Sequence, residues 1–214
     1  HRDLHLSIRR QRQMCIRDRA NTDMSDMASL QNGAKLFMNY CSGCHAIGFM
    51  RYNRIAKDLY LSDSLVSEHL MFTGEKPGET ITTAMPKEAA IKWFGGLPPD
   101  LSLVARSKGT DWIYTYLRGF YEDESKVFGV NNKVLANASM PDVLWSLKEG
   151  KPEAEFDQDV RDITNFLDYV GEPAKLIRTS LGVWVLLFLG ALFILTYLLK
   201  KEYWKDVKYG IWRP

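Results

Sequence analysis

Cys41-Ser42-Gly43-Cys44-His45 is the stretch that decides how the rest of this sequence is interpreted. Residues three apart in one helical turn lie on the same face, so Cys41 and Cys44 can reach one edge of a flat ligand while His45 points elsewhere. This is the spacing of a C-x-x-C-H site for covalent haem attachment. Two thioether bonds would hold the porphyrin edge, and the neutral imidazole of His45 would bind the iron. The motif therefore predicts one covalently attached haem c.

Three other chemistries use closely spaced cysteines. A zinc site needs about four ligands, and outside the motif the chain offers only Cys15, His1, His5 and His69, with no second pair at the usual spacing. A thioredoxin-like redox pair expects a βαβ setting, which the pattern around residues 28–60 does not predict. A disulfide between residues three apart closes too small a loop to stabilise the fold much. The sequence therefore favours haem attachment over all three.

A membrane span lies near the end of the chain. The average composition is that of a soluble protein, with 25% charged residues and a mean hydropathy of −0.24, yet residues 179–199 contain no charged residue. At 1.5 Å per residue, a helix over this stretch is about 30 Å long, the thickness of the hydrocarbon core of a bilayer. A buried core helix is usually shorter and keeps a polar side. We therefore predict a transmembrane helix over residues 177–199, in contact with the lipid bilayer.

The charges beyond this span predict its orientation. Residues 200–214 carry five basic and two acidic side chains, and basic flanks favour the cytoplasmic side. Trp184 near the start of the span and Trp204 after its end fit the aromatic belts of membrane interfaces. We therefore expect a single-pass protein of the cell inner membrane, with a periplasmic haem domain over residues 20–176 and a cytoplasmic tail over 200–214.

The formal net charge of +2 hides an acidic body. Residues 1–19 contain six Arg and two Asp, so these residues and the tail together hold 11 of the 28 basic and 4 of the 26 acidic side chains. The remaining residues, 20–199, have 17 basic and 22 acidic side chains, a net charge of −5. An acidic outer domain attracts basic partners. Without a basic stripe or a Gly-rich phosphate loop there, we expect no nucleic-acid binding.

The first residues do not form a complete secretory signal. Residues 1–19 are basic and lack a run of seven or more apolar residues, the minimum of such a signal. A domain outside the membrane nevertheless needs an export signal upstream. We interpret this segment as a product of cloning or sequence assembly, or else as a disordered basic arm, and assign no role to it or to Cys15.

Hydrophobic spacing predicts three helices in the haem domain. One runs from about Ala28 into the motif, one begins with Asp111 as its N-cap, and one begins at Asp157 or Asp159 and stops near Gly171. The segments between them are less regular. Residues 46–70 are predicted to be helical or irregular, and residues 73–100 and 122–138 to be loops because they are rich in Gly, Pro, Thr and Asn.

Several loop residues are candidates for contact with a haem. Met140, followed by Pro141, could approach the iron from the face opposite His45, but Met85 before Pro86 has the same local appearance, so spacing does not choose between them. His69 is more simply a surface residue between Glu68 and Leu70. Arg106 and Lys108 could pair with the haem propionates, or they could be ordinary solvated charges.

The order of these features resembles a class I cytochrome c domain, mainly α with long loops, followed by one C-terminal transmembrane helix. In detail the chain resembles the cytochrome c1 family of the ubiquinol-cytochrome c reductase (bc1) complex, in its proteobacterial form. The matching segments cover most of residues 28–214: NYCSGCH (39–45), MRYNR (50–54), GLPPDLSLVAR (96–106), DWIYTYLRGFY (111–121), NASMPDVLW (137–145) and the final WRP (212–214).

This resemblance implies roles for single residues. The sixth iron ligand of the family lies in the segment that matches NASMP, so the resemblance favours Met140 over Met85. A basic residue shortly after PPDLS meets a haem propionate, which here falls on Arg106 or Lys108. The family's cleaved export signal has no counterpart in residues 1–19.

The resemblance also implies the function: an electron-transfer subunit of the respiratory reductase, with turnover that needs the other subunits. The implied electron donor is the Rieske iron-sulfur protein, the acceptor is a cytochrome c, the helix over residues 180–199 packs on cytochrome b, and the whole complex is a dimer. We expect acidic side chains to attract a basic cytochrome c, namely Glu122, Asp123, Glu124, Glu153, Glu155, Asp157 and Asp159. Two other functions remain: a membrane-anchored haem enzyme or gas sensor with an open iron site, and a cytochrome subunit of a terminal oxidase or nitric oxide reductase.

Overall fold

The computed structural model describes residues 18–210, and the chain divides into two compact units that meet at Pro173 and Ala174. Most of the basic segment 1–19, including Cys15, lies outside the described residues. Folded contacts are already present at Asp18, whose backbone N–H donates to the hydroxyl of Thr115 at 2.9 Å. The first unit thus begins at least two residues before the boundary predicted at residue 20.

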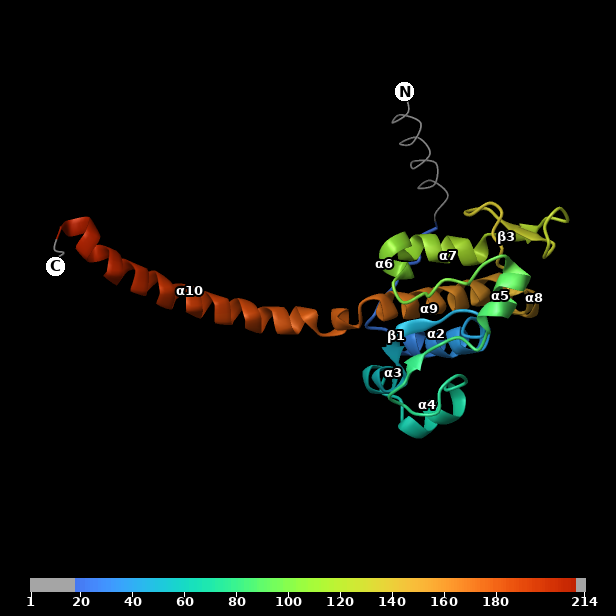
Figure 1. Ribbon diagram of the computed structural model, residues 1–214, viewed down its shortest axis with the longest axis horizontal. Coiled ribbons are helices and arrows are strands. Elements are labelled where there is room, and N and C mark those ends of the chain that lie inside the picture. Colours follow the sequence, from blue (N-terminus) through green and yellow to red (C-terminus); the bar gives the residue numbers. More distant parts are fainter. Residues whose placement is uncertain (1–17, 211–214) are drawn as a thin grey trace, which may run out of the picture. The chain divides into compact units, whose positions relative to one another are not determined.

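Two helices form the centre of the first unit. Helix α2 (Met27–Tyr40) packs against helix α9 (Glu153–Gly171), and Figure 1 shows them side by side. The two backbones approach closely at Gly33, where an added Cβ would lie 2.0 Å from the carbonyl oxygen of Asp162. Phe37, one turn further along α2, contacts Phe166 with ring centroids 5.6 Å apart. A helix crossing this close requires glycine at position 33.

Helix α2 follows from its local sequence, as predicted. The carboxylate of Asp26 caps its first turn by accepting a hydrogen bond from the Ser29 N–H. Leu30, Ala34 and Phe37 are fully buried and recur every three or four residues, which gives the helix one apolar face. The helix ends where Cys41 begins the haem motif.

Helix α9 starts earlier than predicted, at Glu153 instead of Asp157 or Asp159, and ends at Gly171 as expected. Its first turn follows Pro152 and contains Glu153 and Glu155. Negative side chains in a first turn are stabilised by the helix dipole. Apolar periodicity missed this turn because its side chains are mainly polar.

Helices α6 (Val104–Lys108) and α7 (Thr110–Arg118) also pack on α9. The prediction that Asp111 caps α7 is wrong. Gly109, at φ 89°, precedes the first helical residue, Thr110, and makes no side-chain cap. The carboxylate of Asp111 instead accepts a hydrogen bond of 2.9 Å from the backbone N–H of Ala20, which fixes the start of the chain to α7.

The region after the motif contains more regular structure than predicted. Strand β1 (Ile47–Arg51) pairs antiparallel with β2 (Thr80–Ile81), and helices α3 (Tyr52–Asp58) and α4 (Asp63–His69) follow β1. Helix α5 (Lys87–Phe94) lies within the predicted loop 73–100, so that prediction is wrong there. Pro86 and Gly95 suggested a loop, but Pro86 precedes the first turn of α5 and Gly95, at φ 74°, ends it.

A second hairpin lies within the segment predicted as loop 122–138. Strand β3 (Phe120–Glu122) pairs antiparallel with β4 (Val130–Asn132), with Tyr121 opposite Asn131. The carboxylate of Asp123 accepts hydrogen bonds from Ser125 and from the Asn131 side chain, so polar residues form the turn itself. Helix α8 (Trp145–Gly150) then leads to α9.

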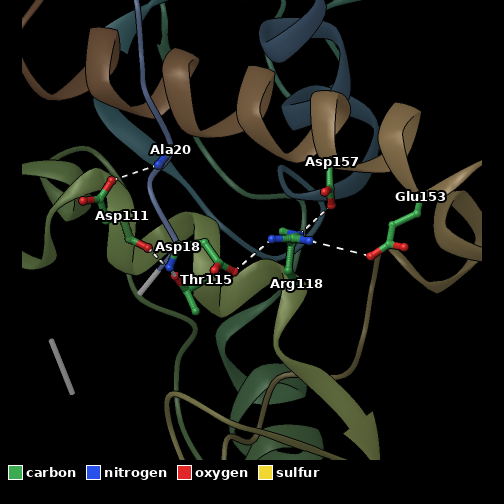
Figure 2. A network of polar contacts seen from close by, with 7 residues as sticks. All are labelled: Asp18, Ala20, Asp111, Thr115, Arg118, Glu153 and Asp157. Carbon is green, nitrogen blue, oxygen red and sulfur yellow. Dashed lines mark hydrogen bonds and ion pairs between the residues drawn. The ribbon is translucent and has the colours of Figure 1, made fainter. Parts of the chain in front are cut away.

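An arginine joins three segments of the first unit. The guanidinium of Arg118, on α7, lies 2.9 Å from the carboxylate of Asp18 and 2.6 Å from that of Asp157 on α9, with Glu153 at 3.9 Å (Figure 2). It also lies over the ring of Tyr114, 5.1 Å from the centroid. Because the Arg118 side chain is only 24% exposed, these contacts are partly shielded from water.

Replacing Arg118 by glutamine is therefore expected to lower the free energy of unfolding by about 2 kcal/mol, since the hydrogen bond to Asp18 is lost and Asp157 keeps an unpaired charge. Arg161→Gln is the matched control, because Arg161 lies over the same Tyr114 ring at 5.8 Å and its guanidinium donates a hydrogen bond to neutral Gln158. Thermal unfolding of both variants, followed by circular dichroism, measures the difference. An equal loss in both would contradict the role assigned to Arg118.

The second unit consists of a short 3-10 turn, η1 (Pro173–Leu176), and helix α10 (Arg178–Tyr209). Among the described residues, α10 is the one helix long and apolar enough to cross a membrane. It continues past the predicted end of the span at Leu199 and stops at Gly210, where φ is 65°. The residues after Leu199 include four Lys and one Glu, which favour helix without being apolar.

Candidate functional site

The first unit contains a cavity of about 660 Å3. This volume falls within the range of about 300–1,000 Å3 typical of small-molecule and cofactor sites. Its walls come from the end of α2, the motif, the segment 94–101, helices α6, α7 and α9, and the loop before α8. The lining side chains are mostly apolar and include Phe94, Leu97, Pro98, Leu101, Leu103, Val104, Trp112, Ile113, Leu117, Leu135, Val143, Ile163 and Leu167.

The motif forms a tight turn at one wall of this cavity. The backbone N–H groups of Cys44 and His45 both donate to the carbonyl of Cys41, at 3.0 and 2.8 Å. Both cysteines are free thiols that line the cavity. Burial, with a smaller contribution from nearby Cys44, raises the pKa of Cys41 to about 12, so its thiol is neutral at pH 7. The turn places both sulfurs at one wall, as thioether attachment requires.

His45 is oriented by a hydrogen bond to the backbone. Its Nδ1 lies 2.8 Å from the carbonyl oxygen of Pro99. A carbonyl only accepts, so Nδ1 carries the proton and Nε2 has a free lone pair for a metal. Burial lowers the pKa of His45, against the opposing effects of the Pro99 carbonyl and the Asp100 carboxylate. The imidazole is therefore neutral, as an iron ligand must be.

The Pro99 carbonyl belongs to the Pro-Pro-Asp-Leu-Ser segment, residues 98–102, whose first four residues line the cavity. The Leu101 N–H donates to the Ala46 carbonyl at 2.8 Å, which aligns the segment with the residues after the motif. Asp100 accepts from the Gly48 N–H at 2.9 Å and from the Ser102 N–H at 2.7 Å. Burial raises the pKa of Asp100, but hydrogen bonds from Ser102 and Gly48 outweigh it and hold that pKa below its usual value.

Met140 lines the same cavity as His45. The hydroxyl of Tyr116, on α7, donates a hydrogen bond to the Met140 sulfur at 3.6 Å. Burial raises the pKa of Tyr116 to about 12, so this hydroxyl stays protonated and remains a donor. Among the described residues, Met85 and His69 do not belong to the lining, and the His69 side chain is 69% exposed on α4.

The two predicted basic residues occupy different positions on α6. Lys108 lines the cavity, and its ammonium lies 5.7 Å from the centroid of the Trp112 ring. Arg106 is exposed and is not among the residues that line the cavity. Its side chain lies against Gly171 instead, with Cγ 3.3 Å from the position that a Cβ on that glycine would take. Both side chains belong to one short helix beside the cavity.

Sequence analysis did not identify the role of Tyr116. Lys108, Trp112, Tyr116 and Phe120 are spaced by four residues, and the rings of Trp112 and Tyr116 stack with centroids 4.9 Å apart. The Tyr116 ring then meets Phe120 edge-on at 5.3 Å. The i, i+4 spacing of Trp112 and Tyr116 was the available signal, because it places these two rings on one face of α7.

The donor set fits a haem better than the competing groups. In residues 18–210, no three His, Cys, Asp or Glu side chains are grouped so that they could hold a metal ion, which disfavours zinc. Strand β1, the strand after the motif, pairs antiparallel with β2, whereas a βαβ unit needs parallel strands. Two thiols, a neutral imidazole and a thioether around an apolar cavity are the groups that a haem c uses.

Comparison of the chain with known proteins identifies the same family as its sequence motifs. The model of the cytochrome C1 family matches residues 18–207. A cytochrome c1 from Allochromatium vinosum is 50% identical, with 88% of each chain covered, and one from Rhodospirillum rubrum is 30% identical over 86% of this chain and 84% of its own. A protein named ammonia monooxygenase gamma subunit, from Nitrosomonas europaea, is 44% identical over 89% of this chain and 88% of its own.

The family match, over residues 18–207, includes the motif, the Met140 loop and most of α10. The fold expected from the sequence, mainly α with one C-terminal apolar helix, is confirmed. The chain belongs to the cytochrome c1 family and is a membrane-anchored c-type cytochrome of the respiratory chain, an electron-transfer subunit of the bc1 complex.

Proposed function

We propose that this chain carries single electrons from the Rieske iron-sulfur protein to a cytochrome c through one haem c attached at Cys41 and Cys44. One observation carries the proposal. A single apolar cavity is lined by both thiols, by His45 and by Met140. If His45 and Met140 both held the iron of a bound haem, they would leave no room for oxygen or peroxide, which favours electron transfer over catalysis at the iron.

Each of these residues has a separate task. When bound, haem c supplies a one-electron iron couple. The Pro99 carbonyl keeps the proton of His45 on Nδ1, so Nε2 is available on one side. The Tyr116 hydroxyl donates a hydrogen bond to the sulfur of Met140 and so orients the second proposed ligand. The apolar lining excludes water and lowers the local dielectric constant, which tunes the potential of the site.

We propose that Arg106 and Lys108 receive the propionates, Lys108 from the cavity wall and Arg106 from the exposed side of the same helix. Lys108 lines the cavity beside Trp112 and can turn its ammonium toward a carboxylate there. Arg106 has an exposed guanidinium in the same helix. A guanidinium can bind a carboxylate through two parallel hydrogen bonds.

The placement in the membrane is also part of the proposal. Helix α10 is taken as the single span, packed on cytochrome b, with residues 200–214 in the cytoplasm because of their basic excess. The haem domain, residues 20–176, then lies on the periplasmic side of the cell inner membrane. There it can meet the Rieske protein and a cytochrome c within a dimeric complex.

The visible spectrum of the purified holoprotein tests this function. We expect a low-spin haem in both redox states and no spectral change when carbon monoxide is added to the reduced protein, because His45 and Met140 fill both axial positions. The haem is also expected to stay with the chain on a denaturing gel, because thioether bonds survive unfolding. Carbon monoxide binding by the unmodified protein would instead support an enzyme or gas sensor.

In the structure, fewer of the predicted acidic side chains are available to a partner than the sequence suggests. Asp159 is buried and paired with Lys151, and Asp157 is paired with Arg118, so neither is available to a partner. Two more of the predicted groups have partners: Glu153 lies 3.9 Å from Arg118, and the carboxylate of Asp123 accepts hydrogen bonds from Ser125 and Asn131. The remaining groups are Glu122, Glu124 and Glu155.

The association rate with a basic cytochrome c is expected to fall steeply as salt is raised, because steering by exposed charges is screened over about 10 Å at 0.1 M. Glu122→Gln combined with Glu124→Gln should flatten this dependence, whereas Glu68→Gln on α4 should leave it unchanged. Stopped-flow mixing at several salt concentrations measures the slope. A slope that is flat in the unmodified protein would remove the acidic surface from the proposal.

A further inference from the structure

The segment that orients His45 is attached to the residues after the motif by four hydrogen bonds. His45 Nδ1 contacts the Pro99 carbonyl at 2.8 Å, and the Leu101 N–H donates to Ala46 at 2.8 Å. The Gly48 N–H donates to the Asp100 carboxylate at 2.9 Å, and the Phe49 N–H donates to the buried Ser102 hydroxyl at 3.1 Å. Each of residues 99–102 thus forms a hydrogen bond with one of His45, Ala46, Gly48 and Phe49.

Asp100 differs from Pro99, Leu101 and Ser102 because both oxygens of its side chain accept a hydrogen bond. Oδ2 accepts from the Gly48 N–H on β1, and Oδ1 accepts from the Ser102 N–H two residues further along its own segment. The first bond joins the two segments, and the second closes a turn directly after Pro99. The Pro99 carbonyl is therefore fixed on its C-terminal side by one side chain.

The side chain could act through its charge or through its geometry. Asp100 is exposed, so solvent and salt screen its charge. Two directional bonds to backbone N–H groups are little affected by such screening. A carboxylate is also the side chain that offers two acceptor oxygens at this distance, whereas an amide offers one. The geometry therefore outweighs the charge.

We propose that Asp100 is the positioning residue of the His45 side of the site: by holding the turn after Pro99 against β1, it sets the strength of the hydrogen bond that His45 Nδ1–H donates. This inference rests on the proposed function, in which His45 Nε2 binds the iron. A stronger bond at Nδ1 makes the imidazole a better electron donor to the metal. Asp100 would thus tune the reduction potential without touching the haem.

The test uses the full-length holoprotein carrying Met140→Leu, so that reduced iron keeps His45 as its one protein ligand. Resonance Raman spectroscopy then reports the iron–histidine stretching frequency, which falls as the hydrogen bond at Nδ1 weakens. We compare Asp100→Asn, which keeps one acceptor oxygen, with Asp100→Glu, which keeps the charge but displaces it. Ser102→Ala removes the hydroxyl that accepts from the Phe49 N–H but leaves both backbone hydrogen bonds to Asp100 in place, so it is the matched control in the same segment. Either Asp100 variant alone suffices if the other fails to fold.

We expect a lower stretching frequency in both Asp100 variants and a smaller change in Ser102→Ala, with a higher reduction potential in each Asp100 variant on the unmodified Met140 background. An unchanged frequency in Asp100→Glu together with a raised potential in Asp100→Asn would overturn the proposal, because charge alone would then be acting. Absence of any iron–histidine band in the Met140→Leu parent would contradict the ligand assignment of the proposed function instead. The two failures are therefore distinguishable.

Discussion

Replacing Met140 by leucine is expected to open the haem iron of the holoprotein to carbon monoxide. Leucine is apolar and close to methionine in volume, so the cavity wall should remain closed to bulk water, but it has no sulfur to bind the iron. The reduced variant should change from low to high spin, and carbon monoxide should bind essentially all of the haem. The reduction potential should fall, since a thioether ligand raises it.

Met85→Leu is the matched control for this prediction. Met85 also precedes a proline and has the same local sequence appearance, but it lies outside the residues that line the described cavity. Its spectrum should stay low spin and indifferent to carbon monoxide. Visible spectra of the reduced proteins, with and without carbon monoxide, make the comparison. If Met85→Leu opens the iron and Met140→Leu does not, the sixth ligand is Met85.

The second large effect is expected from Gly33→Ala, at the crossing of α2 and α9. A Cβ on Gly33 would lie 2.0 Å from the Asp162 carbonyl oxygen and 2.8 Å from the Phe166 Cβ. Neither atom belongs to the far end of a flexible side chain, so the two helices must separate. Overpacking of this kind should lower the free energy of unfolding by about 3 kcal/mol, which corresponds to a melting temperature lower by roughly 6–12 °C in a chain of this size.

Gly150→Ala is the control for Gly33→Ala. Gly150 also lies in a helix, but an added Cβ there meets no atom within 4 Å. Alanine at that position should be neutral or slightly stabilising, because it favours helix more than glycine does. Thermal unfolding of both holoproteins in detergent, followed at 222 nm, tests the difference. Similar melting temperatures for the two variants would mean that the helices do not cross at Gly33.

Loss of stability at Gly33 should also reach the haem site. The crossing lies two turns before Cys41 on α2, and Ile163 and Leu167 of α9 line the cavity. Separation of the helices would therefore move the motif away from one wall of the cavity. We expect Gly33→Ala to weaken the Met140–iron bond before the protein unfolds, seen as partial carbon monoxide binding below the melting temperature.

Several features could be predicted from the sequence because neighbouring residues determine them. The spacing of Cys41, Cys44 and His45 fixes a turn with both thiols on one side, whatever surrounds it. Helix α2 follows from the Asp26 cap and from apolar residues every three or four positions. The membrane helix follows from an uncharged stretch of sufficient length. In each case the interactions lie within a few residues of chain.

Other predictions failed where a distant partner decided the outcome. Asp111 has the sequence of an N-cap, but its carboxylate binds the backbone of Ala20. Helix α5 was predicted as loop because Pro86 and Gly95 were read as breakers, although they lie at its two ends. The first turn of α9 was missed because it is polar. Short or polar helices carry little apolar periodicity, so their sequences cannot be distinguished from loops.

By itself the sequence determined the C-x-x-C-H turn, one long apolar helix and, through its motifs, a family. It could not choose between Met140 and Met85 by spacing, and only the tertiary structure places Met140 in the cavity of His45, with the Tyr116 hydroxyl at its sulfur. The same holds for the contact of Gly33 with Asp162. Local propensities extend over a few residues, whereas these contacts join segments far apart in the chain and exist only once the helices have packed.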